Sequence, residues 1–185
     1  MRPAEHNSEP SADFDASSIG AQLIGLSGPI PAGHLFVIAS RYHAEACDSM
    51  TAAAVEAMCR ASIDRDRIHV VRVPGAWELP LAVQTALQLP HTLGAVAIGV
   101  VIRGETTHDE HINRAVSLEL MRLGTEYGKP VGLGLLTCNT AEQVRARTGG
   151  ELGNKGTEAA EAVLEMLRVV ARVQSSSYAK PALSC

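Results

Sequence analysis

One short turn holds the residue types that could bind an anion and move protons. Residues 104–107 stand between an unbroken apolar run and an amphipathic segment, and His108 follows them directly. We expect Glu105, Thr106 and Thr107 to supply the first free backbone N–H groups of a helix, where the positive end of the dipole suits a phosphate. Histidine exchanges protons near neutral pH, so this turn predicts a catalytic anion site with His108 as its acid–base group.

The residues after His108 leave a second interpretation open, because a lone histidine on a helix is often structural or solvent-facing. Asp109 and Glu110 carry carboxylates that could orient the imidazole or raise its pKa. His111 lies near the same helix face, but no third well-spaced ligand follows it, so we expect no metal here. The adjacent anion-binding turn favours the catalytic role.

Two further turns carry side chains suited to a flat ligand. Tyr42 follows the apolar run 35–39, and aromatic residues make up only 3% of the chain, so a ring at this place favours stacking. Ala76, Trp77 and Glu78 stand at the turn after the next strand. The alternatives are that Tyr42 caps the edge of the core, that Trp77 belongs to the core, and that Glu78 is an ordinary first-turn acid.

Alternating strands and helices must position these turns. Strands are predicted over residues 35–39, 68–71, 94–102 and 131–136, and the unbroken apolar run 94–102 is typical of a parallel strand covered on both faces. Five helices are predicted. The first has Met50, Ala54, Ala57 and Met58 on one face, and the second covers about 77–87, with Pro80 in its first turn. The third covers about 107–127, the fourth is short and is capped by Thr140 and Gln143, and the fifth covers about 154–173. This order predicts an α/β fold with a four-stranded parallel sheet and helices on both faces, which binds ligands at the carboxyl ends of its strands.

Composition limits the class of protein. A chain of 185 residues that is 46% hydrophobic can bury one core. The net charge of −4, without a basic cluster, argues against a nucleic-acid partner. Four cysteines without a CxxC pair favour reduced thiols in the cytoplasm. We expect neither a membrane span nor a signal peptide, because no apolar stretch is long enough and the first residues lack an apolar core.

Composition also predicts the domain limits. Residues 1–32 are rich in Ser, Ala, Asp, Gly and Pro, and we expect a flexible arm there, with one short strand over Gln22–Ile24. Residues 33–173 form the catalytic domain in this interpretation, and residues 174–185 a frayed tail.

From Ser40 to Met166 the chain resembles the lumazine synthase family. Four segments carry the resemblance in the family's order and spacing: Arg41-Tyr42-His43, residues 73–80 (VPGAWELP), residues 101–108 (VIRGETTH), and the run from Thr140 through Arg147 to residues 153–156 (GNKG). The resemblance implies a flavodoxin-like three-layer α/β/α domain and a transferase of riboflavin biosynthesis. This activity condenses 5-amino-6-(D-ribitylamino)uracil with 3,4-dihydroxy-2-butanone 4-phosphate to 6,7-dimethyl-8-ribityllumazine, phosphate and water, and it needs no cofactor.

The resemblance also implies a role for each matching residue. His108 transfers protons during Schiff-base formation, phosphate loss and ring closure. The phosphate is held by Glu105, Thr106 and, from a neighbouring subunit, Arg147. The pyrimidine and ribityl groups are held by Tyr42, Ala76, Trp77, Glu78, Val100, Val101, Ile102 and Leu133.

The implied assembly is a homopentamer with sites between neighbouring subunits. Leu133 is placed at the end of the fourth strand and Arg147 on the helix after it, whereas the other site residues lie at the ends of the first three strands, so these groups need not converge within one subunit. Monomers would then hold only half-sites. The short link over residues 148–153 resembles members that build an icosahedral shell, a 60-mer, and this slightly favours a shell. Riboflavin synthase is the protein partner that the resemblance implies.

Three residues depart from the family pattern. Asp109 stands where Phe or Tyr is common, Leu133 where Phe is common, and Glu151 where Lys is common. Two rival functions follow from the sequence: a catalytically weak relative that binds riboflavin or forms a shell, and a nucleotide-binding flavodoxin-like domain. The nucleotide-binding alternative lacks support, because no GxGxxG motif follows the first strand and no Walker lysine is present.

Overall fold

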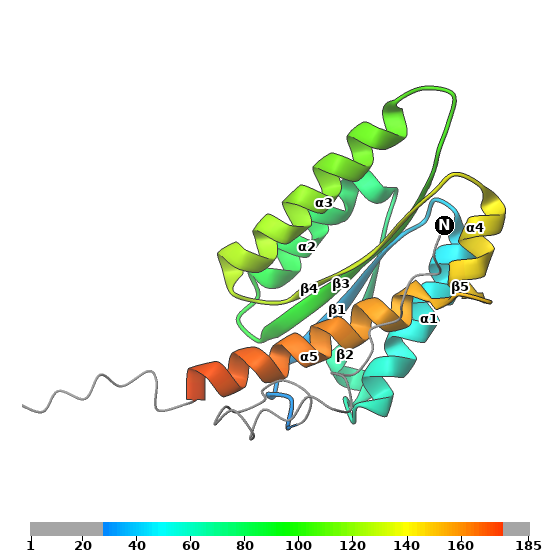
Figure 1. Cartoon of the computed structure of the whole chain (residues 1–185). Coiled ribbons are helices and arrows are strands. Elements are labelled where there is room, and N and C mark those ends of the chain that lie inside the picture. The colour runs from blue at the N-terminus through cyan, green and yellow to red at the C-terminus, as the bar shows by residue number, and fades with distance from the viewer. Residues whose placement is uncertain (1–27, 176–185) are drawn as a thin grey trace, which may run out of the picture.

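A parallel sheet of four strands forms the centre of the molecule (Figure 1). The computed structural model describes residues 28–175 of the 185-residue chain. The strands are β1 (His34–Ser40), β2 (Ile68–Val73), β3 (Thr92–Ile102) and β4 (Val131–Cys138), in the order β2-β1-β3-β4. All pairs are parallel. The predicted α/β fold and its sheet are therefore confirmed, with each strand slightly longer than its apolar run.

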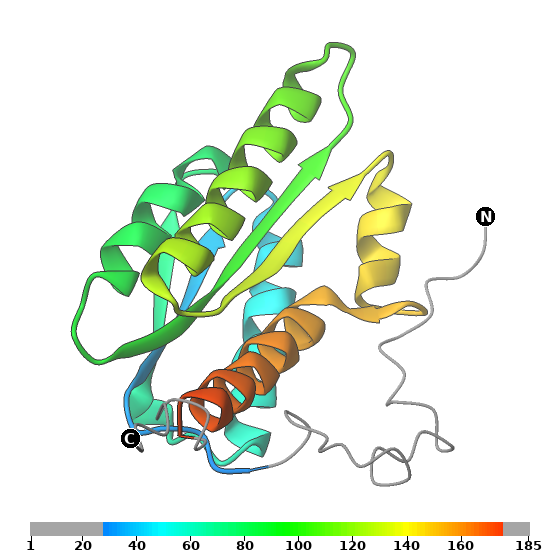
Figure 2. The ribbon, with the colours of Figure 1, turned by 60° about the vertical axis from the view of Figure 1, so that its left-hand side comes forward.

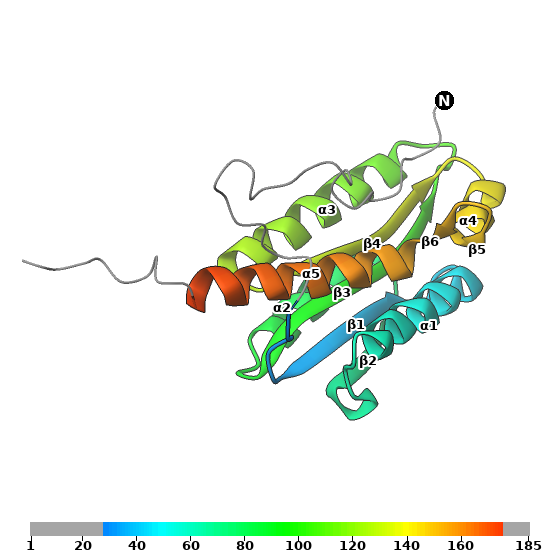
Figure 3. The ribbon, with the colours of Figure 1, turned by 60° about the horizontal axis from the view of Figure 1, so that its bottom comes forward.

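Helices cover both faces of the sheet, which gives three layers (Figures 2 and 3). Helices α1 (Ala44–Arg60) and α5 (Lys155–Ser175) lie on one face, and α2 (Leu79–Leu87) and α3 (His108–Tyr127) lie on the other. The predicted apolar face of α1 is buried, from Met50 to Met58. Strand β3 is in the middle and is buried from Gly94 to Val100, as its unbroken apolar run requires.

Small residues allow α1 and α5 to approach each other closely. A Cβ atom added to Gly156, at the start of α5, would lie 2.0 Å from the Met50 carbonyl oxygen of α1. Gly132 of β4 is equally restricted, because its added Cβ would lie 2.3 Å from the Ala159 oxygen. Glycine at these positions therefore sets the spacing between α5, α1 and the sheet.

The segment between β4 and α5 contains structure that the sequence did not predict. Helix α4 (Ala141–Arg147) begins as expected, with Thr140 Oγ1 accepting from the Gln143 N–H at 3.4 Å. Two very short antiparallel strands follow, β5 (Thr148–Gly150) and β6 (Gly153–Asn154). Ser49 of α1 holds this hairpin by donating to the Thr148 oxygen at 2.6 Å and accepting from Asn154 Nδ2 at 3.4 Å.

Two helix starts also differ from expectation. A 3₁₀ turn, η3 (Ala76–Glu78), precedes α2, so α2 begins at Leu79 and Pro80 stays in its first turn. A second 3₁₀ turn, η2 (Arg65–Arg67), precedes β2. Helix α3 begins at His108, with Thr107 as its N-cap.

The predicted strand over Gln22–Ile24, most of the predicted arm and most of the predicted tail lie outside the described residues. Residues 28–33 are described and contact the domain. Ile30 packs against the core, and Arg67 donates to the oxygens of Pro31 and Gly33 at 2.9 and 2.7 Å. The ordered contacts of the domain thus begin before residue 33. Between residues 28 and 175, no helix is long and apolar enough to cross a membrane.

Candidate functional site

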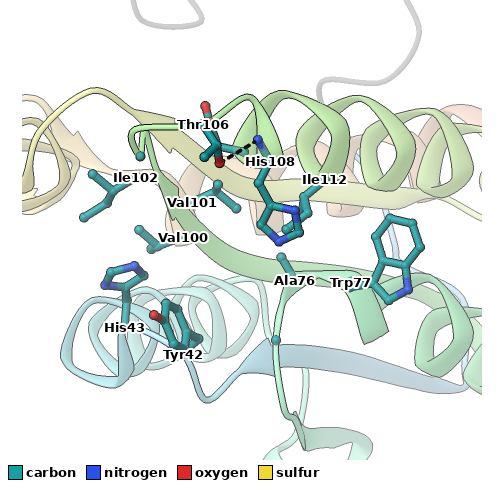
Figure 4. Close-up of a pocket in the computed structure, with 13 residues that line it drawn as sticks. Tyr42, His43, Ala76, Trp77, Val100, Val101, Ile102, Thr106, His108 and Ile112 are labelled. Atoms are coloured by element: carbon teal, nitrogen blue, oxygen red, sulfur yellow. Dashed lines mark hydrogen bonds between the residues drawn. The ribbon is translucent and has the colours of Figure 1, made fainter.

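A cavity of about 380 Å³ lies at the carboxyl ends of β1, β2 and β3 (Figure 4). This is the edge at which open α/β sheets bind their ligands. The loops that enter α1, η3 and α3 surround it, and the last residues of β3 form its apolar floor. Its lining comprises Tyr42, His43, Gly75, Ala76, Trp77, Val100, Val101, Ile102, Gly104, Thr106, His108, Asp109 and Ile112.

The structure brings most of the predicted site residues together in this cavity. Those that line it are Tyr42, Ala76, Trp77, Val100, Val101, Ile102, Thr106 and His108. Glu105 stands between the lining residues Gly104 and Thr106 in the chain. Glu78 is the last residue of η3 and follows the lining residues Ala76 and Trp77. Leu133 and Arg147 do not line the cavity.

Hydrogen bonds fix the backbone of the loop that carries Tyr42. The buried Ser40 hydroxyl accepts from the Tyr42 N–H at 3.0 Å and donates to the Tyr42 oxygen at 3.4 Å. The Cys47 thiol donates to the same oxygen at 3.3 Å. Burial raises the pKa of Cys47 to about 11, so the thiol keeps its proton near neutral pH. Tyr42 is 68% exposed and lines the cavity, which favours a ligand contact over a cap on the edge of the core.

The second aromatic ring enters from η3. Trp77 is 61% exposed, and its neighbour Ala76 is buried against the core. Trp77 is therefore not a core residue. Glu78 folds back toward the preceding turn, since a Cβ atom added to Gly75 would lie 3.2 Å from its Oε2.

The turn before α3 differs from the predicted anion site in one respect. Thr107 has φ −79° and ψ 11°, which are not helical values, and the Thr106 hydroxyl accepts from the His108 N–H at 3.4 Å. The N–H groups without a partner within the helix thus belong to Thr107, His108, Asp109 and Glu110, and the expectation is wrong for Glu105 and Thr106. The positive end of the α3 dipole still points to the cavity, where His108 is exposed.

Leu133 is the third residue of β4, near its amino end, so the expectation that it lies at the end of this strand is wrong. Leu133 is 45% exposed, although it pairs with Ala97 of the central strand. Arg147 ends α4 and donates to the Gln143 oxygen at 3.3 Å. Burial raises the pKa of the Cys138 thiol, and the nearby charge of Arg147 opposes this rise. Neither residue lines the cavity of its own subunit.

Five residues of the lining were not predicted as ligand contacts: His43, Gly75, Gly104, Asp109 and Ile112. Ile112 was detectable, because it stands one helical turn after His108. His43 gave no such signal. It adopts the left-handed conformation, with φ 56° and ψ 51°, and its ring centroid lies 4.8 Å from that of Tyr42.

The arrangement suits a flat polar heterocycle next to a small anion. Two exposed aromatic rings and an apolar floor provide stacking surfaces, and the start of α3 provides N–H donors beside an imidazole. Between residues 28 and 175, no group of three His, Cys, Asp or Glu side chains could hold a metal ion.

Comparison with known proteins agrees with this geometry. The sequence model of a family described as 6,7-dimethyl-8-ribityllumazine synthase matches residues 33–171. A protein of that name from Rhodopirellula baltica is 54% identical over 150 residues, which cover 81% of this chain and 97% of the relative. Proteins of the same name from Gemmatimonas aurantiaca and Xanthomonas oryzae are 44% and 39% identical, over 72% and 76% of this chain and 81% and 91% of their own lengths.

Proposed function

The chain belongs to the 6,7-dimethyl-8-ribityllumazine synthase family, and from that membership we propose that the cavity at the carboxyl edge of its sheet is the active site. The enzyme is a transferase of riboflavin biosynthesis. It condenses 5-amino-6-(D-ribitylamino)uracil with 3,4-dihydroxy-2-butanone 4-phosphate to 6,7-dimethyl-8-ribityllumazine. The observation that carries the site assignment is the convergence of Tyr42, Trp77, Thr106 and His108 on one cavity.

The uracil substrate stacks on Tyr42 in this proposal. Val100, Val101 and Ile102 at the end of β3 lie beneath it, and the loop with Ala76, Trp77 and Glu78 contacts its ribityl chain. The exposed rings support this assignment, because burying them against a flat heterocycle removes apolar surface from water.

The phosphate ester binds at the start of α3 in this proposal. The loop of Glu105 and Thr106 and the first helical N–H groups hold the phosphate, which the helix dipole attracts. Arg147 reaches it from a neighbouring subunit, and its guanidinium suits bidentate binding of a phosphate.

His108 moves the protons of the reaction in this proposal. The amine of the uracil attacks the ketone, and a first water leaves to form a Schiff base. Phosphate is then eliminated, and the ribitylamino nitrogen attacks the carbonyl that results, so that the ring closes with loss of a second water. Each step needs a proton added to or taken from a leaving or attacking group, and His108 lines the cavity at the phosphate end. The substrates supply all reacting atoms, so no cofactor is required.

A homopentamer with shared sites is the proposed assembly. The separation of Leu133 and Arg147 from the cavity of their own subunit supports it, since a neighbour then completes the site. We also propose the icosahedral shell as the larger assembly and riboflavin synthase as a partner. A cytoplasmic location fits the free thiols of Cys47, Cys59 and Cys138.

One assay tests the proposed function. The two substrates are mixed with the purified protein, and lumazine formation is followed by absorbance, with the reaction without protein as the baseline. We expect turnover well above that baseline, and Tyr42→Ala should weaken the use of the uracil substrate. A protein that retains a yellow ligand but forms no lumazine would instead be a riboflavin-binding relative without this activity.

A further inference from the structure

His43 occupies a backbone conformation that most side chains avoid. With φ 56° and ψ 51° it is one of two non-glycine residues with positive φ among residues 28–175, the other being Ser62. The left-handed conformation costs about 1 to 2 kcal/mol for most residues, although Asn, Asp and His tolerate it better. Its side chain makes no capping hydrogen bond to α1, so capping does not explain the residue.

The conformation directs the imidazole toward the ring of Tyr42. The two centroids lie 4.8 Å apart, and the ring planes meet at 82°, which is an edge-to-face contact. Both rings line the cavity (Figure 4). Among the described residues, this is the one ring contact that Tyr42 makes.

The backbone on both sides of the pair is held in place. Ser40 and Cys47 bind the Tyr42 oxygen, the Arg41 N–H donates to the Val73 oxygen at 2.8 Å, and the Cys47 N–H donates to the His43 oxygen at 3.1 Å. The main chain is thus fixed, whereas Tyr42 is 68% exposed and its ring meets no ring other than that of His43 within residues 28–175. The hydrogen bonds of the main chain therefore leave the side-chain rotamer of Tyr42 undetermined.

We propose that His43 is a positioning residue that holds the Tyr42 ring ready to stack on the heterocyclic substrate. A ring that is already oriented loses less conformational entropy when the ligand binds, so affinity for the heterocycle rises. The gain in affinity applies to the uracil substrate and to flat analogues of it, and not to the phosphate substrate. The inference rests on the proposed function only for the identity of that heterocycle.

Two substitutions separate this role from a merely structural one. His43→Asn accepts the left-handed backbone but is too short to present a ring edge, so we expect an unchanged melting temperature, a KM for the uracil substrate raised roughly three- to tenfold, and kcat nearly unchanged. His43→Phe keeps a ring edge but strains the backbone. It should lower the melting temperature and leave the KM for the uracil substrate close to that of the native protein.

Ser62→Asn is the matched control, because it changes the other left-handed residue outside the cavity. It should alter neither KM. In a Tyr42→Ala background, His43→Asn should add no further loss, since its effect passes through the tyrosine. An unchanged KM for the uracil substrate in His43→Asn, an equal loss in His43→Phe, or an additive loss in the double variant would each overturn the proposal.

Riboflavin affinity, measured by quenching of the single tryptophan, gives a readout that does not need turnover. The same order of variants is expected, with weaker binding in His43→Asn and near-native binding in His43→Phe. If the native protein forms no lumazine, the proposed function fails. The riboflavin affinities then still decide whether His43 positions Tyr42.

Discussion

At the scale of single residues, His108 combines exposure, a place in the cavity lining and a position at the first turn of α3. We predict that His108→Ala lowers kcat about ten- to a hundredfold and leaves a rate above the uncatalysed reaction. General acid–base catalysis is lost, but the site still holds the two substrates in register. Steady-state absorbance kinetics measure this. His111→Ala on the same helix is the control, and an equal loss there would contradict the assignment.

The role proposed for Arg147 concerns a different kinetic parameter. We predict that Arg147→Ala raises the KM for the phosphate substrate roughly ten- to a hundredfold, because a charge-assisted contact to phosphate is lost, while the KM for the uracil substrate changes little. Arg145→Ala is the control, since Arg145 lies on the same helix and pairs with Glu142 at 2.7 Å. An Arg147→Ala enzyme with native KM and native turnover would refute the phosphate role.

At the scale of elements, the sequence predicted what apolar periodicity determines. The run 94–102 indicated the central strand, and the faces of the helices followed from their spacing. The β5–β6 hairpin was not predicted, because strands of three and two residues are too short to show an alternation of apolar and polar residues. The left-handed conformation of His43 was not predicted, because the pattern of apolar residues carries no information about the backbone angle φ. Leu133 and Arg147 entered as site candidates only through the family resemblance, since the role proposed for them needs a second subunit.

The contact of α1 with α5 gives a prediction about stability. Gly156→Ala should lower the free energy of unfolding by at least about 2 kcal/mol, because the new methyl group meets the Met50 backbone and the two helices must separate. Urea unfolding measures the change. Gly124→Ala in α3 is the control: its added Cβ meets the Lys129 oxygen at 3.4 Å, so stability should be kept or rise by up to about 1 kcal/mol. Equal behaviour of the two variants would contradict the close approach.

Helix α1 also contributes a pH dependence. Burial raises the pKa of Cys47 from 9.0 to about 11 in the folded state, so its contribution to stability is fully present below pH 9 and is lost as the pH rises toward 11. Cys47→Ser keeps a hydroxyl donor near the Tyr42 oxygen and does not ionise in this range. We predict that it reduces the loss of unfolding free energy between pH 8 and 11 by up to about 2 kcal/mol. An alkaline loss equal to that of the native protein would exclude the buried thiol as its source.

At the scale of the whole molecule, shared sites predict complementation between defective subunits. In the proposed assembly, Tyr42→Ala damages the cavity of its own subunit, and Arg147→Ala damages the group that completes the cavity of a neighbour. When equal amounts are coexpressed, about a quarter of the sites combine an intact cavity with an intact edge, so kcat/KM should exceed the mean of the two parents. If each site were complete within one subunit, the kcat/KM of the coexpressed mixture would equal the mean of the two parents. Light scattering gives an independent check, since a fully active monomer or dimer would exclude the shared site.

The hydrogen bonds of Ser49 have a consequence for such a ring. Helix α1 starts at the loop of Tyr42 and His43, and about one and a half turns later its Ser49 binds the oxygen of Thr148, the residue after Arg147. In a ring with shared sites, Tyr42 serves one cavity and Arg147 of the same subunit serves the next. In the proposed ring, helix α1 therefore connects two adjacent cavities through one rigid element.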